Sequence, residues 1–430
     1  MSSGDTLIPG LRVLEHEFRV PLDHGAPQRG ELSVFAREVV APGSAATDRP
    51  WLVFLQGGPG FESPRPPSKG GWLERAVSDY RVLLLDQRGT GRSSRVCARS
   101  LGRLDSPAEQ AEYLSHFRAD SIVRDAELLR RELVGPEGRW SVLGQSFGGF
   151  CAVHYLSTFP ESLREVYITG GLPPLMQPAE AVYRATYPRV LDRNRRFYER
   201  YPRDVQRAWR IVDCLEAREV SLPGGGRLSP RRFQQLGMAF GQSGGFEQVH
   251  YLIEDAFVTS REGPELSFAF LSAVERAQPF DANPLYAVLH EACYAQQAAT
   301  AWAAERVRGE HPELDPTANE RVFFTGEMVY PWMFEEYEQL RSFEEAAHLL
   351  AEREDWPLLY DAERLAQNEV PCVATVYDDD MYVERTFSME TARAIAGMRT
   401  WVTNEFEHNG LRSEGETILG RMIEMMRGER

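Results

Sequence analysis

The sequence has little cysteine and no long apolar run. Its 430 residues include five cysteines. Their number is odd, they are widely spaced, and none of them forms a C-x-x-C pair. This distribution excludes a disulfide framework and a zinc site, and it is typical of free thiols in a reducing compartment. No run approaches the roughly 18 apolar residues of a membrane-spanning helix, and the opening stretch MSSGDTLIPGLRVLEHEF lacks the pattern of a signal peptide. We therefore expect a cytoplasmic protein with no membrane partner.

The sequence also lacks an excess of positive charge. It has 48 Lys and Arg against 64 Asp and Glu, which gives a formal net charge of −16 at pH 7. Such a chain is repelled by nucleic acid and by anionic membrane surfaces, so we expect neither as a partner. An acidic field favours a cationic small substrate, although many enzymes are acidic for solubility alone. We expect no cofactor and no metal, and the sequence leaves the oligomeric state open.

What the chain does contain is ample material for a core, arranged first as strands. Hydrophobic residues make up 43% of it, and the first 50 residues alternate with the period of two that strands show. The runs 51–56 and 81–86 are apolar throughout, as strands covered on both faces are. A helical stretch at 120–133 and a further strand at 163–171 continue the alternation. This order predicts an α/β fold with a mostly parallel sheet flanked by helices.

The periodicity of the sequence changes after the first 175 residues. From 176 to 369 helical periodicity prevails, and then PCVATVY (371–377) returns as a short β run. We interpret 388–397 and RTWVTNEFEH (399–408) as helical segments after that run. The simplest organisation is one sheet domain, residues 1–175 and 370–430, interrupted by a large helical insertion at 176–369.

A serine between glycines is the first candidate for chemistry. Ser146 is the centre of Gly144-Gln145-Ser146-Phe147-Gly148, a G-x-S-x-G pattern that follows a strand and precedes a helix. In such a nucleophile elbow the glycines leave room for a strained turn, and the start of the helix faces the developing anion. Chance matches to the bare pattern are frequent, and a small residue in a tight turn is the alternative. The strand–turn–helix context favours a nucleophile.

A nucleophilic serine needs a base and an orienting carboxylate, which in this fold follow it along the chain. Among the nine histidines only His408 lies after the returning β run, in a polar loop that can reach a cleft. His290, within the insertion, could also lie near the cleft. The acid is expected just past CVATVY, where Asp378, Asp379 and Asp380 are all candidates. A solvated acidic turn is the alternative for two of the three.

The oxyanion hole is expected from two sources. One is the backbone N–H of Phe147, next after the nucleophile, and the other is the loop LQGGPGFESPRP after the strand at 51–56. Its Gly-Gly-Pro-Gly turn leaves N–H groups uncovered by side chains, as an anion site requires. We therefore expect Gly57, Gly58 and Phe147 to form the hole.

At this point the motifs resemble a known family. GGPG (57–60), DQRGTGRS (86–93), GQSFGGF (144–150) and EHNGLR (407–412) together are similar to prolyl aminopeptidase (proline iminopeptidase), a serine peptidase of the α/β-hydrolase superfamily. GGPGFESPRP, FFTGEMVYPW and YDDDMYV resemble its long form, which has an enlarged helical cap. The resemblance implies Ser146 as nucleophile, His408 as base, and Asp380 as acid, because the family's acid directly precedes the MYV-like segment. Gln56 departs from the histidine that many relatives carry before Gly-Gly-Pro.

The resemblance also implies how a free N-terminal proline is recognised. In the family, cap glutamates pair with the substrate amine, and the matching segments here give Glu291 in LHEACY and Glu327 in FFTGEMVYPW. Each lies in an apolar, aromatic setting that is unusual for a solvated charge, with a buried ion pair to an arginine as the alternative. Nearby aromatic residues are expected to form an apolar pocket for the pyrrolidine ring, or else cap core: Tyr294, Tyr330, Trp332 and Phe334.

The sequence therefore predicts a serine exopeptidase that releases N-terminal proline from small peptides through an acyl-enzyme. Activity should fall both as His408 is protonated and as the substrate amine, with a pKa of about 8, is deprotonated. A broader aminopeptidase or an esterase is the main alternative, because the same triad hydrolyses esters and a fold does not fix the substrate. A non-catalytic binding protein of the same fold is a second alternative, against which the intact motif set argues.

Overall fold

One mixed sheet of nine strands organises the molecule. In the computed structural model, which describes residues 4–43, 48–261, 263–317 and 321–430, the strand order is β1-β2-β3-β5-β4-β6-β7-β10-β11. The strands are β1 (Asp5–Ile8), β2 (Leu11–Pro21), β3 (Glu31–Val40), β4 (Trp51–Leu55), β5 (Arg81–Asp86), β6 (Trp140–Gln145), β7 (Leu163–Thr169), β10 (Cys372–Tyr377) and β11 (Met398–Thr403). β1, β2 and β3 are antiparallel to their neighbours, and β5, β4, β6, β7, β10 and β11 run parallel to one another. The predicted α/β fold with a mostly parallel sheet is confirmed.

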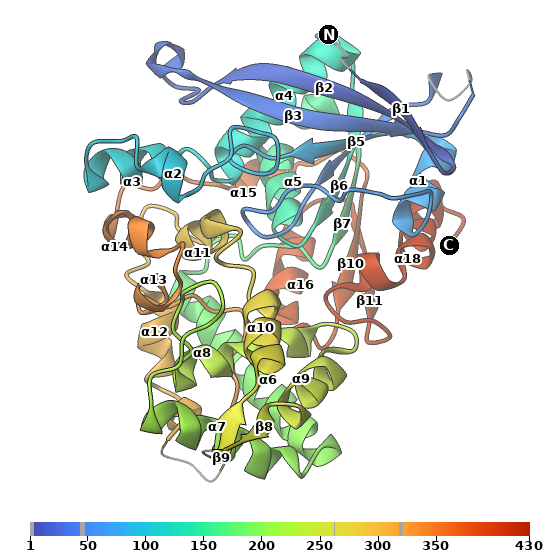
Figure 1. Cartoon of the computed structure of the whole chain (residues 1–430). Helices are drawn as coiled ribbons and strands as arrows, with labels where there is room; N and C mark the ends of the chain where they lie inside the picture. Colours follow the sequence, from blue (N-terminus) through green and yellow to red (C-terminus); the bar gives the residue numbers. More distant parts are fainter. Residues whose placement is uncertain (1–3, 44–47, 262, 318–320) are drawn as a thin grey trace.

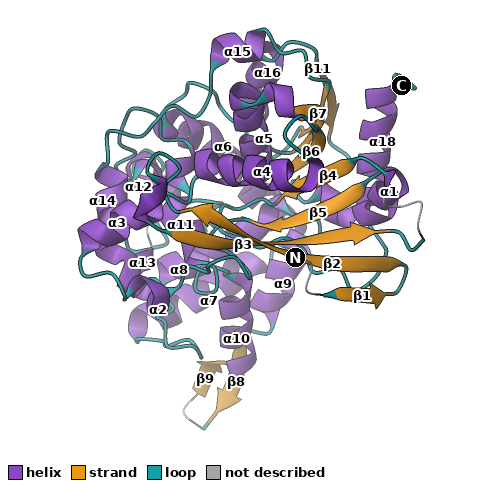
Figure 2. Cartoon of the chain, turned by 90° about the horizontal axis from the view of Figure 1, so that it is seen from above, coloured by secondary structure: helices purple, strands orange, loops and turns teal. Residues whose placement is uncertain are grey.

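Helices cover both faces of the parallel strands because successive side chains point to opposite sides. Leu52 and Phe54 of β4 belong to the apolar cluster that includes Trp72 and Ile418, whereas Val53 and Leu55 belong to the larger cluster on the other face. Figure 2 shows the sheet between α5 and α18. The helices of this part are α1 (Trp72–Asp79), α2 (Ala98–Leu101), α3 (Pro107–Ser115), α4 (Ala119–Val134), α5 (Phe147–Thr158), α15 (Ala362–Ala366), α16 (Arg385–Ala394), α17 (Gly410–Ser413) and α18 (Gly415–Arg427).

One predicted helix is wrong. The stretch 399–408 contains most of strand β11, which pairs in parallel with β10 from Cys372↔Met398 to Tyr377↔Thr403. The run Thr400-Trp401-Val402-Thr403 consists of β-branched and aromatic residues, which fit a pleated surface better than a helix. The end strand therefore completes the sheet immediately before the loop that holds His408.

Between β7 and β10, the mainly helical segment from α6 to α14 lies on one side of the sheet (Figure 1). Its helices are α6 (Ala179–Arg200), α7 (Asp204–Ala217), α8 (Pro230–Gln234), α9 (Gly245–Glu254), α10 (Phe268–Ala277), α11 (Pro284–Leu289), α12 (Ala303–Arg308), α13 (Met333–Glu336) and α14 (Glu344–Glu352). A two-stranded hairpin, β8 (Phe257–Ser260) with β9 (Gly263–Leu266), also belongs to it. We call this segment the insertion. None of the described helices is both long and apolar enough to cross a lipid bilayer.

The insertion contacts the sheet domain at the loops after β4 and β5. A side chain at Gly60 would place its Cβ 2.7 Å from the backbone nitrogen of Tyr286, at the start of α11. A Cβ at Gly89 would lie 2.5 Å from a methyl carbon of Leu285. Both distances are too short for a real carbon contact, so α11 packs directly on these two glycines. The carboxyl ends of the parallel strands therefore face the insertion, where open α/β sheets bind ligands.

Candidate active site

Ser146 occupies a sharp turn between β6 and α5. Its backbone has φ 54° and ψ −126°, a conformation that L residues rarely adopt, and its N–H donates to the carbonyl of Thr169 at 3.0 Å. A Cβ at Gly148 would lie 1.9 Å from the carbonyl oxygen of Leu55, and one at Gly144 would lie 2.4 Å from the carbonyl oxygen of Gly148. The flanking glycines thus allow the close packing that the turn requires, which is the geometry of a nucleophile elbow.

Three side chains from three different loops form one hydrogen-bonded line. The Oγ of Ser146 lies 2.9 Å from Nε2 of His408, and Nδ1 of His408 lies 2.6 Å from Oδ2 of Asp380. The other carboxylate oxygen of Asp380 accepts the backbone N–H groups of Tyr382 at 2.8 Å and Val383 at 3.1 Å. All three members are at most 7% exposed. The arrangement matches a nucleophile, a base and an orienting acid.

The two neighbouring aspartates do not reach the histidine. Asp378 pairs with Arg385 at 2.9 Å, and Asp379 pairs with Arg196 at 2.9 Å, with both carboxylates more than one third exposed. They therefore form the solvated part of this acidic turn. The structure brings only Asp380, of the three predicted candidates, to the imidazole.

The electrostatics of His408 suit a general base. Burial alone would lower the pKa of this imidazole, but the Asp380 carboxylate, with a further contribution from Glu327, raises it above its ordinary value of 6.5. The positive charge of Arg412 acts in the opposite direction. A raised pKa makes the imidazole a stronger proton acceptor. As the pH falls, the imidazole is therefore protonated at a higher pH than an ordinary histidine.

The predicted oxyanion loop lies against Ser146. A Cβ at Gly57 would come within 2.9 Å of the Cβ of Ser146, so only glycine allows the backbone this close. Gly58 and Ser146 line one cavity, and the loop and turn hydrogen bonds of the described residues do not use the N–H of Gly57, Gly58 or Phe147. The N–H of Phe147 begins α5, where the helix dipole favours negative charge. These N–H groups are available to stabilise an oxyanion beside Ser146.

The cavity in front of Ser146 has a volume of about 260 Å³ and is bounded by both the sheet domain and the insertion. It is lined by Gly57, Gly58, Phe61, Gln145, Ser146, Met238, Gln242, Pro279, Tyr286, Glu327, Tyr382, His408, Asn409 and Arg412. This volume is below the roughly 300–1,000 Å³ of pockets for drug-sized ligands, so the cavity suits a small ligand. Its aromatic wall has the rings of Phe61 and Tyr286 4.9 Å apart.

Glu327 contributes the carboxylate of this cavity. The hydroxyl of Tyr286 donates to it, and Nε2 of His290 lies 3.7 Å from its other oxygen. Burial alone would raise the pKa of Glu327, but His290, His408 and Tyr286 together hold it below its ordinary value. Its side chain is 18% exposed. The structure thus holds a negative charge in the same cavity as Ser146.

Glu291 lies elsewhere. Its carboxylate accepts the backbone N–H of Ala303 at 3.1 Å and of Ala304 at 2.8 Å, at the start of α12. Burial raises its pKa, and it does not belong to the lining of the cavity. The structure therefore does not bring Glu291 to the site, and its contacts are those of a carboxylate that caps a helix.

The predicted aromatic pocket residues also lie outside the cavity lining. Tyr330 stacks on Trp332 at 5.6 Å and hydrogen-bonds the hydroxyl of Tyr187 at 3.0 Å, while Phe334 contacts Trp302. Tyr294 lies behind the elbow, 5.8 Å from the ring of Phe150. Their rings pack against other aromatic side chains and do not line the cavity.

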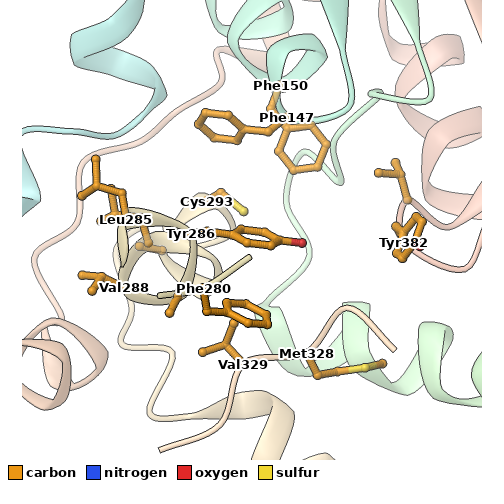
Figure 3. Close-up of a cluster of buried hydrophobic side chains, with 14 of the residues drawn as sticks. Phe147, Phe150, Phe280, Leu285, Tyr286, Val288, Cys293, Met328, Val329 and Tyr382 are labelled. Atoms are coloured by element: carbon orange, nitrogen blue, oxygen red, sulfur yellow. The ribbon is translucent and has the colours of Figure 1, made fainter. Parts of the chain in front are cut away.

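An apolar cluster joins the elbow to the insertion. Figure 3 shows Phe147 and Phe150 of α5 above Leu285 and Tyr286 of α11, with the hydroxyl of Tyr286 directed toward Tyr382. The rings of Tyr382 and His408 are 4.7 Å apart in an edge-to-face arrangement. The cluster fixes the aromatic wall relative to the nucleophile.

Comparisons with known proteins agree with this architecture. Residues 50–208 match the family model of the alpha/beta hydrolase fold. A proline iminopeptidase from Aeromonas sobria is 51% identical over 422 residues, covering 98% of both chains. The chain belongs to the proline iminopeptidase family. A second member, from Aspergillus aculeatus, is 36% identical over 425 residues, covering 96% of this chain and 93% of that relative.

Membership in the proline iminopeptidase family confirms the predicted resemblance and the predicted hydrolase. The sequence reasoning missed several residues of the site: Phe61, Met238, Gln242, Tyr286, Tyr382, Asn409 and Arg412. Phe61, Tyr382, Asn409 and Arg412 lie inside motifs that carry the family resemblance, so the motifs themselves were an available signal. Tyr286 and Met238 had no such sequence signal, because only the packing of the insertion brings them to the cavity. Gln56, which replaces the histidine of many relatives, is buried. Its backbone carbonyl accepts a hydrogen bond from the side-chain amide of Gln87 at 3.0 Å.

Proposed function

We propose that this member of the proline iminopeptidase family is a serine exopeptidase that releases N-terminal proline from small peptides. The observation that carries the proposal is the combination of the Ser146–His408–Asp380 line with the carboxylate of Glu327 in one small cavity. The first arrangement performs acyl transfer, and the second attracts a protonated amine. Two relatives at 51% and 36% identity over nearly the full chain support a prolyl aminopeptidase activity.

Acylation starts at the hydroxyl of Ser146. Its oxygen attacks the carbonyl carbon of the N-terminal proline while Nε2 of His408 takes the hydroxyl proton. Asp380 keeps Nδ1 of the imidazole protonated and stabilises the imidazolium that forms. The N–H groups of Gly58 and Phe147, with Gly57 beside them, would receive the oxyanion, each donor contributing about 3 kcal/mol to transition-state stabilisation.

The intermediate collapses when His408 returns the proton to the leaving nitrogen. The peptide bond breaks, the shortened peptide departs as an amine, and prolyl-Ser146 remains as an ester. A water molecule then attacks this ester with His408 again as base, and free proline is released.

Recognition of the free amine is assigned to Glu327. A protonated pyrrolidine nitrogen has two N–H donors, and a carboxylate in a partly buried cavity pairs with them by charge-assisted hydrogen bonds. We propose Phe61, Tyr286 and Tyr382 as the apolar wall for the ring, in place of the sequence candidates. The insertion, with residues 176–369 as a cap domain, would supply the specificity of the site.

The direct test is release of free proline from prolyl-alanyl-alanine, compared with the N-acetylated peptide. We expect turnover of the first and a loss of at least about 100-fold for the second, because acetylation removes the positive charge that Glu327 pairs with. Ser146→Ala should abolish turnover without loss of fold, by about 10⁴-fold or more. Retained turnover in Ser146→Ala would refute the assignment of Ser146 as the nucleophile. Faster hydrolysis of short acyl esters or alanine amides than of proline amides would favour the alternative activities.

A further inference from the structure

The cavity carries opposite charges in different environments. Glu327 is 18% exposed and is contacted by buried groups, whereas Arg412 is an exposed residue of the same lining. Ser146 and His408 are buried and line the cavity with them. The site therefore has a negative charge at a sheltered position and a positive charge at its solvent-facing rim.

Arg412 is held in position by its backbone. It lies in α17, one turn after His408, and its N–H donates to the carbonyl of Asn409 at 2.8 Å. A Cβ at Gly410 would come within 2.6 Å of the hydroxyl of Tyr377, so this turn packs directly on β10. The guanidinium is thus presented from a fixed short helix beside the base.

The guanidinium has no partner within the described residues. Neither an ion pair nor a side-chain hydrogen bond of Arg412 occurs in 4–43, 48–261, 263–317 and 321–430. Nearby arginines differ, since Arg189 pairs with Glu384 and Arg193 pairs with Glu407. In a chain with 64 acidic and 48 basic residues, an unpaired arginine at the rim of a catalytic cavity is a free anion-binding group.

We propose that Arg412 binds the C-terminal carboxylate of dipeptide substrates, so that the preferred substrates are prolyl dipeptides with both termini free. The inference rests on the proposed function, since that function orients the substrate. With the amine at Glu327 and the scissile carbonyl at Ser146, the leaving residue extends away from Glu327 toward the rim. In a dipeptide, the carboxylate follows the scissile bond by a single residue, a Cα step of about 3.8 Å.

Size and charge both favour this substrate class. A cavity of about 260 Å³ suits a ligand of dipeptide size better than a long peptide. The net charge of −16 disfavours a carboxylate ligand overall, and an unpaired cation offsets this locally. A guanidinium matches a carboxylate with two parallel hydrogen bonds. Because Arg412 is exposed, water and salt weaken the pair, and we expect an effect of about three- to tenfold.

The test compares L-prolyl-L-alanine with L-prolyl-L-alaninamide, which has the same scissile bond but no carboxylate. For the wild-type protein we expect the kcat/KM ratio of acid to amide to be about three to ten, carried mainly by KM. In Arg412→Gln the ratio should fall to one or below, because the acidic chain then favours the cationic amide. Arg195→Gln is the matched control: it removes an exposed arginine of α6 outside the cavity lining and should keep the wild-type ratio.

Two further measurements keep the proposal open to refutation if Arg412→Gln folds poorly. Arg412→Lys keeps the charge without the paired N–H groups and should give an intermediate ratio. In the wild type, raising the salt concentration from about 20 mM to about 500 mM should lower the acid-to-amide ratio by screening. A ratio that is the same in wild type, Arg412→Gln and high salt overturns the role of Arg412. Failure to cleave either substrate would instead refute the proposed function.

Discussion

Replacing Glu327 with glutamine separates amine recognition from the chemistry of the triad. The substitution keeps the shape and one oxygen that can accept the hydroxyl of Tyr286, so the surrounding packing should survive. It removes the negative charge of the cavity. We expect lower affinity for substrates with a free N-terminal amine, seen mainly in KM.

The magnitude follows from the burial of the carboxylate. Removing one partner of a buried charge pair costs about 2–5 kcal/mol, and the 18% exposure of Glu327 places it toward the lower end. A loss of about 2–3 kcal/mol corresponds to a decrease of about 30- to 160-fold in kcat/KM. The assay is hydrolysis of a chromogenic proline amide over a range of concentrations at a pH where the substrate amine is protonated.

A matched variant exists within the insertion. Glu291→Gln changes a second buried cap glutamate, but one whose carboxylate accepts the N–H groups of Ala303 and Ala304. The amide can accept only one of these, so we expect the free energy of unfolding to fall by about 1 kcal/mol, with KM unchanged. The same assay with thermal unfolding measures both effects. If Glu291→Gln raises KM as much as Glu327→Gln does, or if Glu327→Gln leaves KM unchanged, the assignment of Glu327 is refuted.

The remaining predictions concern the triad and the elbow. Asp380→Asn should reduce kcat by roughly 10³- to 10⁴-fold, whereas Asp379→Asn should change it less than twofold; similar losses in both would contradict the assignment of the acid. Because the pKa of His408 is raised above 6.5, the acid limb of kcat/KM should have its midpoint above pH 6.5, and Arg412→Gln should move that midpoint up by removing a charge that lowers this pKa. An acid-limb midpoint that moves to lower pH in Arg412→Gln would contradict this direction. Gly148→Ala would put a Cβ 1.9 Å from a β4 carbonyl oxygen, so we expect little folded protein by circular dichroism.

The sheet and the triad motifs could be predicted because their signals are local. Ser146, Asp380 and His408 each follow a strand, and strands β6 and β10 are buried along their whole length. A parallel sheet gathers the loops after such strands at one edge, so the residues meet although Ser146 and His408 are 262 positions apart. The strand β11 was missed because six residues are too few for a period of two to be told from one of 3.6, and polar residues that continue the segment follow it directly.

The two cap glutamates could not be separated from the sequence. Glu291 and Glu327 both stand in apolar local sequence, and each has aromatic residues within a few positions. What differs is tertiary: the start of α12 folds back over Glu291 and supplies two N–H donors, whereas Glu327 meets Tyr286 and His290. Partners of a buried charge are set by packing between segments, which short-range periodicity does not encode.

The cavity is built from two parts of the chain, and this affects what substitutions between them do. The residues proposed as nucleophile, base, acid and oxyanion loop all lie within 1–175 and 370–430, while Tyr286 and Glu327 come from the insertion. The packing of α11 on Gly60 and Gly89 places the Tyr286 wall of the cavity relative to Ser146. A side chain at either glycine would push α11 away and move the wall of the cavity relative to a triad that stays intact. Such changes should raise KM before they lower the reactivity of Ser146, which labelling by an organophosphonate would measure separately.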